Sequence, residues 1–223
     1  MMRIRFQQSL DDLKEQLLVM AGLAEQAIQR AIEAYRVRDL SICDLVSRSE
    51  IAINRLERDI DQAALDLLAM EQPMAIDLRF ILAVIKINGD LERIGDQSMG
   101  IARRTKETLN MEEIDLPVDF AAMGEFAGRM IRSAVQALLE GDAALAESVR
   151  SMDDEIDRMN RLAHADLLKM IQEKPQFTPQ AMKGILVAKN LERIADHASN
   201  IATDVIFWIR GADVRHQLSM SMD

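Results

Sequence analysis

Two pairs of carboxylates stand out because the same pairing occurs in both halves of the chain. The stretch "DLERIGDQSMGIARR" places Glu92 four residues before Asp96, and "NLERIADHASNIATD" does the same with Glu192 and Asp196. Residues four apart share one face of an α-helix, where two like charges repel by about 0.3 kcal/mol even when they are exposed. Because the same unfavourable pairing occurs in both halves, it indicates a site that binds a cation.

Helical geometry places these acids among apolar side chains. At about 100° per residue, Asp96 lies about 40° from Glu92, in the sector that also holds Ile81 and Ile85. Glu192 and Asp196 share a sector with Ile185 in the same way. Half-buried carboxylates without a counter-charge cost roughly several kcal/mol, so the pattern predicts a bound cation. The remaining polar residues occupy a separate sector, which holds Arg79, Lys86, Asp90, Arg93 and Gln97 in the first half and Lys183, Asn190, Arg193 and His197 in the second.

A polar stripe precedes each carboxylate pair. The members of each stripe recur on one helical face, and they are Glu50, Asn54, Glu57 and Asp61 in the first half and Asp153, Asp157, Asn160 and His164 in the second. If successive helices form an antiparallel hairpin, the residue numbers of any two residues that face each other across it add up to the same total. Pairs centred on the turns at Pro73 and Pro175 should then face each other, namely Glu50 with Asp96, Asn54 with Glu92, Asp153 with Asp196 and Asp157 with Glu192.

Oxygen donors on facing helices suit Mg²⁺, Mn²⁺, Ca²⁺ or iron, and they are poor ligands for a structural zinc site. The competing interpretation is that the acids pair with basic residues three positions away. Arg93 with Asp96, and Arg193 with Asp196, are within reach on a helix. The matched levels in both halves favour the cation site.

The histidines do not support an enzyme. His197 points about 100° away from Asp196 and is predicted to be exposed, whereas His164 shares the polar stripe and is a candidate ligand. A di-iron oxidase needs Glu-x-x-His pairs, and no histidine has a glutamate three residues before it. Phosphotransfer through His197 is a rival that the first half could not share, because Gln97 stands there. We find no nucleophile–base constellation and no Gly-rich phosphate loop, so we predict a protein that is not an enzyme.

The elements that must position these residues are helices, since apolar residues recur at helical spacing almost throughout. "MAGLAEQAIQRAIEA" overlays "MGEFAGRMIRSAVQA" at an offset of 103, which drops to 100 after the second inter-helix turn. The chain is therefore predicted to be all-α, a tandem repeat of two three-helix bundles at 1–115 and 116–223. Its six long antiparallel helices are expected at 5–37, 40–70, 75–108, 119–140, 142–172 and 178–210.

Composition sets the class of protein. The chain has 223 residues, of which 49% are hydrophobic and only 4% aromatic, which suits helix–helix packing around a sizeable core. A net charge of −10 argues against nucleic-acid binding. The lone cysteine, Cys43, excludes an intrachain disulfide and fits a reducing compartment. The chain has no apolar run of membrane-spanning length and no signal-peptide core, so we expect a cytoplasmic protein.

At "QPMAIDLRFILAVIKINGDLERIGD" and "NLERIADHASNIATDVI" the sequence resembles the PhoU family of phosphate-transport regulators, over essentially the whole chain. The resemblance implies Glu/Asp-x-x-x-Asp motifs that hold metal ions on the bundle surface. Three motifs match, and in the fourth Asn54 stands where an acid would follow Glu50. Asn200 keeps a family asparagine that Gly100 replaces in the first half, so we expect the second bundle to bind metal more strongly. The ion would be divalent or ferric (Mg, Mn, Fe or Zn).

Functionally, the resemblance implies a cytoplasmic negative regulator of phosphate uptake and of the phosphate-starvation response. Such a protein would contact the ATPase subunit of the membrane-associated phosphate ABC importer and the phosphate sensor histidine kinase, and it would dimerise with a second copy of itself. The alternative, from another class, is a helical metal-storage protein whose metal cluster is itself the function.

Overall fold

A computed structural model describes residues 2–71 and 73–211, and this part of the chain is helical without a β-strand. The predicted second bundle extends to residue 223, so its final segment, 212–223, lies outside the described residues. The elements are α1 (Met2–Val37), α2 (Leu40–Glu71), α3 (Ile76–Thr108), α4 (Phe120–Glu140), α5 (Ala143–Ser151), α6 (Asp153–Glu173), the 3₁₀ turn η1 (Pro175–Phe177) and α7 (Thr178–Arg210).

Side-chain caps explain several of these boundaries. Asp119 starts α4 by accepting a hydrogen bond from the backbone N–H of Ala122 at 2.9 Å. Gly141 ends that helix in the left-handed conformation, with a φ of 63° that glycine adopts without strain. Asp142 then starts α5 by accepting from the N–H of Ala144 at 2.9 Å. These capped ends agree with the breaks predicted from the sequence.

One predicted helix is wrong. The segment 142–172 is not continuous, because it is interrupted at Met152 between α5 and α6. The hydroxyls of Ser148 and Ser151 donate to backbone carbonyls three residues earlier, both at 2.7 Å, which weakens the regular helical ladder at this point. Three consecutive acids, 153–155, then favour a new helix N-terminus, where the helix dipole is positive. Apolar periodicity continues across such a break and therefore did not reveal it.

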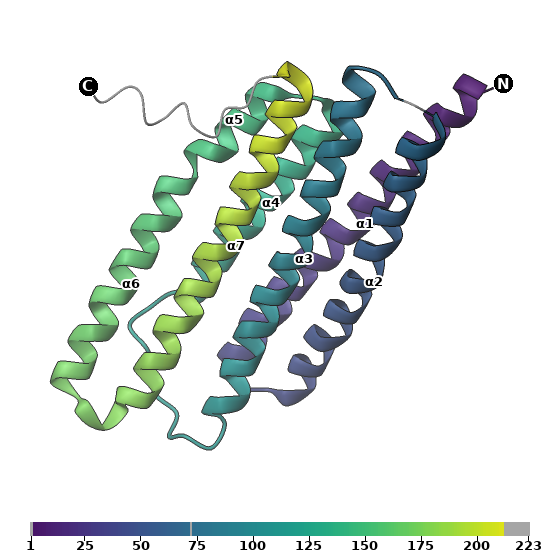
Figure 1. The fold of residues 1–223 in the computed structure, drawn as a ribbon. Coiled ribbons are helices and arrows are strands. Elements are labelled where there is room, and N and C mark those ends of the chain that lie inside the picture. Colours follow the sequence, from purple (N-terminus) through teal and green to yellow (C-terminus); the bar gives the residue numbers. More distant parts are fainter. Residues whose placement is uncertain (1, 72, 212–223) are drawn as a thin grey trace, which may run out of the picture.

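The helices form two layers (Figure 1). Helices α6, α7, α3 and α2 lie side by side in that order, while α1 and α4 lie behind them. Each half contributes a three-helix unit, with α1, α2 and α3 in the first and α4, α5–α6 and α7 in the second. The apolar side chains of both halves form one continuous core cluster. The predicted all-α architecture of two repeated helical bundles is confirmed.

The two halves meet mainly along α3 and α7, which share the most extensive contact between any two elements. They run antiparallel, and polar side chains line much of the contact. Lys86 pairs with Asp204 at 2.9 Å. Closer to the middle, His197 Nδ1 lies 2.8 Å from Asp90 Oδ1.

The prediction that His197 is solvent-exposed is therefore wrong. Its side chain is only 22% exposed, because α3 of the other half covers it. Helical angles locate a side chain around its own helix, but they do not say which polar sector another bundle will cover. The sector that the sequence assigned to solvent is in large part the junction between the two halves.

The junction has an approximate internal two-fold symmetry. At an offset of 100 residues, the contact of Asp90 with His197 corresponds to that of Asn190 with Gln97, whose side chains are joined by a 2.9 Å hydrogen bond. Gly100 lies against Asn190, and a Cβ atom at this glycine would come within 2.4 Å of the Asn190 amide nitrogen. The close approach explains why glycine stands there, since a larger side chain would displace Asn190.

Truncating the core should destabilise the whole molecule. Ile53 and Ile51 lie on the same helix, but Ile53 is fully buried whereas Ile51 is 67% exposed. We expect Ile53→Ala to lower the free energy of unfolding by about 2–5 kcal/mol, because it leaves a cavity in the core, and Ile51→Ala to lower it by less than about 0.5 kcal/mol. Urea denaturation followed by circular dichroism checks both values, and equal losses would contradict the assigned core.

Candidate metal centres

The second half brings four carboxylates together on the α6–α7 hairpin. They are Asp153, Asp157, Glu192 and Asp196, and we call them the second acidic cluster. Burial, followed by the negative charges of its neighbours in the cluster, raises the pKa of Asp196 to about 6. Burial and the adjacent acids also raise the pKa of Asp153. The hairpin arithmetic thus located the residues that interact.

Charge in this cluster is incompletely compensated. The Oδ1 atom of Asp153 is buried and accepts no hydrogen bond from any described residue. Glu192 is only 8% exposed, and its carboxylate is held by the ammonium group of Lys189. Asp157 pairs with Arg161 at a longer distance, 3.6 Å. A buried carboxylate oxygen without a donor is costly, and a cation would satisfy it.

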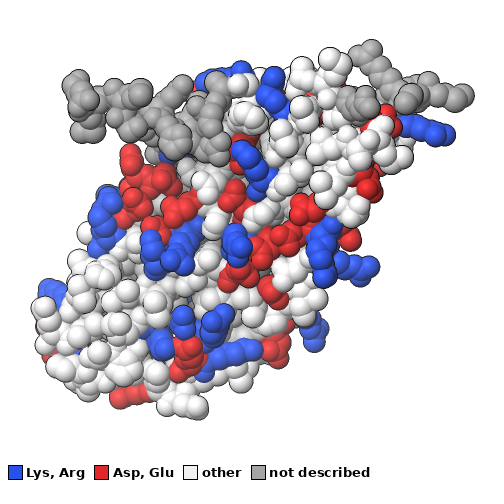
Figure 2. All heavy atoms as spheres, in the orientation of Figure 1, with Lys and Arg blue, Asp and Glu red and all other residues white. Residues whose placement is uncertain are grey.

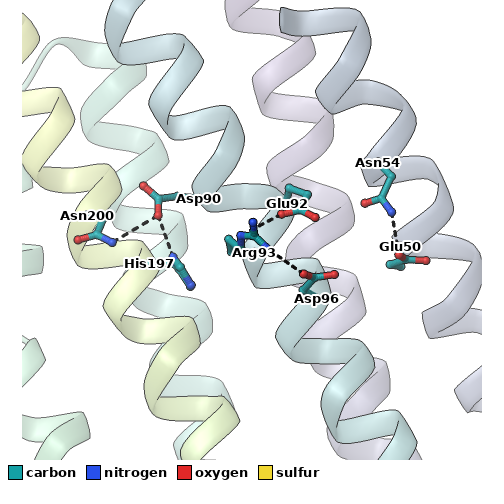
Figure 3. Close-up of polar contacts among 8 residues, drawn as sticks. All are labelled: Glu50, Asn54, Asp90, Glu92, Arg93, Asp96, His197 and Asn200. Atoms are coloured by element: carbon teal, nitrogen blue, oxygen red, sulfur yellow. Dashed lines mark hydrogen bonds and ion pairs between the residues drawn. The ribbon is translucent and has the colours of Figure 1, made fainter.

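The first half has an equivalent group on the α2–α3 hairpin, which we call the first acidic cluster: Glu50, Glu57, Glu92 and Asp96. Burial is the largest cause of a raised pKa at Glu92, followed by the charge of Asp96, with smaller effects from the other two acids. Asn54 donates a hydrogen bond to Glu50 Oε1 at 2.7 Å (Figure 3). The incomplete motif, formed by Glu50 and Asn54, therefore has an amide donor at the position where the other three motifs have an acid.

Arg93 distinguishes the first cluster from the second. Its guanidinium lies between Glu92 and Asp96, 3.4 Å from the former and 3.1 Å from the latter (Figure 3). The salt-bridge interpretation therefore holds for Arg93. It does not hold for Arg193, which is exposed and forms no ion pair with any described residue. A cation already occupies the space between the first pair of acids.

The structure directs three further candidate ligands elsewhere. Asp61 accepts a hydrogen bond from the Nδ2 atom of the buried Asn88 at 2.9 Å. Asn200 turns its amide towards Asp90 of the other half, at 3.4 Å (Figure 3). His164 is exposed on α6 and forms no hydrogen bond or ion pair with the described residues. None of the three is joined to an acidic cluster by these contacts.

As the side chains stand, no three His, Cys, Asp or Glu residues in the described part of the chain converge closely enough to hold a metal ion. The chemistry of the donors nevertheless fits a hard cation, because each cluster offers carboxylate oxygens whose charges repel one another. Sequence reasoning did not predict a role for Lys189 or Asn88. The position of Lys189 three residues before Glu192 was the available signal.

None of the described helices combines the length and the apolar character that are needed to cross a bilayer.

Comparisons with known proteins agree with the repeat. The family model described as the PhoU domain matches residues 17–105 and again 120–205. The chain is 37% identical to the phosphate-specific transport system accessory protein PhoU homolog of Pseudomonas aeruginosa, over 95% of this chain and 88% of the relative. The Pseudomonas putida homolog is also 37% identical, over 95% and 83%. The crystal structure of PhoU from Pseudomonas aeruginosa superposes with a TM-score of 0.87 at 35% identity, covering 93% of this chain and all of the other.

The raised pKa of Asp196 predicts a specific pH dependence. Because folding raises this pKa from 3.8 to about 6, the native state binds the proton more tightly than the unfolded state. Stability without metal should therefore increase as the pH falls through about 6. We expect Asp196→Asn to raise the free energy of unfolding near pH 7.5 by about 1 kcal/mol, allowing for solvent screening, by about half as much near pH 5, and to have little effect once the pH falls below the unfolded pKa of 3.8.

Urea unfolding in the presence of a chelator measures this difference. Asp166→Asn is the matched control, since Asp166 is exposed on α6 and should alter neither the stability nor its pH dependence. A loss of stability on Asp196→Asn near pH 7.5 would contradict the electrostatic assignment.

Proposed function

The chain belongs to the PhoU family, and from this premise we propose that it is a cytoplasmic accessory protein that negatively regulates phosphate uptake and the phosphate-starvation response. The observation that carries the proposal is the match of the PhoU domain to both repeats. Relatives at 37% identity are named as accessory proteins of the phosphate-specific transport system. The protein acts as an adaptor and catalyses no reaction of its own.

Its partners are the ATPase subunit of the phosphate ABC importer and the phosphate sensor histidine kinase, and two copies of the chain form a homodimer. It associates with the membrane complex peripherally. The face formed by α6, α7, α3 and α2 supports an adaptor role, because acidic side chains gather in a band across its middle with basic side chains between them (Figure 2). Such a charged face favours recognition of a complementary protein surface.

A cavity lies where α3 passes between α2 and α7. Residues of both signs line it, including Glu57, Lys86, Asp90, Arg93 and Asp204. Its charged residues are in part paired with one another, as Lys86 is with Asp204. This composition supports an interaction surface rather than a catalytic pocket.

We further propose that the acidic clusters hold divalent or ferric ions. Asp153, Asp157, Glu192 and Asp196 would hold the tighter ion, because one oxygen of Asp153 lacks a hydrogen-bond donor. The first acidic cluster would bind more weakly, since Arg93 already neutralises part of its charge. A bound ion would supply positive charge that stabilises the facing helices of each hairpin.

Removal of the protein tests the regulatory role. In a strain that lacks it, we expect phosphate uptake and phosphate-starvation gene expression to become constitutive in phosphate-rich medium, because the negative regulator is absent. Radiolabelled phosphate uptake and an alkaline-phosphatase-type reporter measure this, and expression of the wild-type chain should restore repression. Normal phosphate control together with altered metal tolerance would instead favour a metal-storage protein.

Metal binding is tested separately with the purified full-length protein. We expect Glu192→Gln/Asp196→Asn to remove the tighter of the bound Mn²⁺ ions, because it deletes the α7 carboxylates, and Glu92→Gln/Asp96→Asn to remove only weaker binding. Elemental analysis and titration followed by electron paramagnetic resonance give the stoichiometry. The two double variants serve as controls for each other. Equal metal content in wild type and both variants would exclude the clusters as metal sites.

A further inference from the structure

Lys189 occupies the second acidic cluster from within its own helix. Its ammonium nitrogen lies 2.6 Å from Glu192 Oε1 and 2.5 Å from Glu192 Oε2, so both carboxylate oxygens face one cation. The Glu192 side chain is 11% exposed, whereas that of Lys189 is 47% exposed. The lysine therefore reaches from the solvent into the cluster and covers its most buried acid.

This contact is the closest cationic compensation that the cluster has. Asp196 and Asp153 form no ion pair within 4 Å in the described part of the chain, and Arg161 approaches only Asp157, at the exposed edge. Lys189 at Glu192 and Arg161 at Asp157 thus provide two cations for four carboxylates, and the cluster keeps excess negative charge. The charge of Lys189 only partly offsets the burial and the neighbouring acids that together raise the pKa of Asp196.

In the first acidic cluster the compensating cation comes from a different position in the repeat. Gly89 stands where the repeat would place a lysine, and it offers no side chain. Arg93 provides the cation there, whereas its counterpart Arg193 makes no ion pair with the described residues. In each cluster, therefore, one basic side chain contacts the acids of α3 or of α7. The two basic residues occupy positions that are not equivalent in the repeat.

We propose that Lys189 is a tethered counter-cation that neutralises Glu192 when the second cluster holds no metal, and that a metal ion must displace it in order to bind. This inference rests on the proposed metal function and adds its regulation. A protonated lysine carries three donors and no lone pair, so it competes with a metal for Glu192 and cannot serve as a ligand. Its flexible four-carbon stem lets the ammonium return to water without movement of the backbone.

The tether also imposes selectivity by charge. A monovalent ion that displaced Lys189 would replace one positive charge by another, so its attraction to the carboxylates would be little greater. The ammonium group also has a high effective concentration at Glu192, because it is attached to the same helix. A divalent or trivalent ion gains from the excess carboxylates that Lys189 leaves uncompensated. Lys189 therefore lowers the affinity for every metal but leaves multivalent ions able to bind.

Removing the ammonium tests the proposal. In the full-length protein at neutral pH, Lys189→Met should raise the affinity of the second cluster for Mn²⁺ about tenfold, which corresponds to about 1.4 kcal/mol. Titration followed by electron paramagnetic resonance measures free and bound Mn²⁺. Lys169→Met is the matched control, since it removes a 71% exposed lysine of the same half and should leave the affinity unchanged. Arg93→Met should raise Mn²⁺ affinity in the first cluster only.

A second measurement needs no substitution and remains decisive if Lys189→Met fails to fold. Acetic anhydride labelling of the wild-type protein, read by mass spectrometry, should modify Lys189 faster when Mn²⁺ is bound, and Lys169 at the same rate with and without metal. If the wild type binds Mn²⁺ but Lys189→Met binds it no more tightly, the proposed role of Lys189 is overturned while the metal proposal stands. An unchanged labelling rate of Lys189 in the presence of bound Mn²⁺ has the same consequence. If neither wild type nor variant binds Mn²⁺, both this inference and the metal proposal are overturned.

Discussion

The antiparallel packing of α3 against α7 is the contact on which the rest of the molecule depends. It joins the apolar cores of the two repeats into one cluster, and it sets the side-by-side order of α6, α7, α3 and α2. Polar pairs across it, such as Asp90 with His197, specify register, because a shifted alignment would leave half-buried charges without partners.

Two carboxylate clusters of similar ancestry have reached different electrostatic states. In the first, Arg93 bridges Glu92 and Asp96 on one helix, and Asn54 donates to Glu50. In the second, Lys189 covers Glu192 alone, and a buried oxygen of Asp153 has no donor among the described residues. A half-buried carboxylate is stabilised by positive charge, by hydrogen-bond donors or by protonation, and the two clusters differ in how much of this the chain itself provides. This difference is the basis of the proposal that the second cluster binds a cation more strongly than the first.

Much of the fold could be predicted because duplication and helical periodicity are local properties of a sequence. Prolines and capping acids marked most helix ends, and the constant-sum relation across Pro175 brought Asp153 and Asp157 opposite the acids of α7. The break at Met152 was missed because apolar spacing continues through it. The partner of Asn200 was also missed, because it comes from the other repeat.

The sequence by itself determined the all-α class, the two repeats, the helical faces and the residues of both acidic clusters, since each follows from spacing along one chain segment. Only the tertiary structure decided which polar sector is covered, and it left His197 partly covered beside Asp90 rather than fully exposed. The tertiary structure also determines which basic side chain contacts the acids of each cluster, Arg93 in the first and Lys189 in the second. Those choices depend on distances between side chains that reach one another in three dimensions, and spacing along the sequence does not specify such distances.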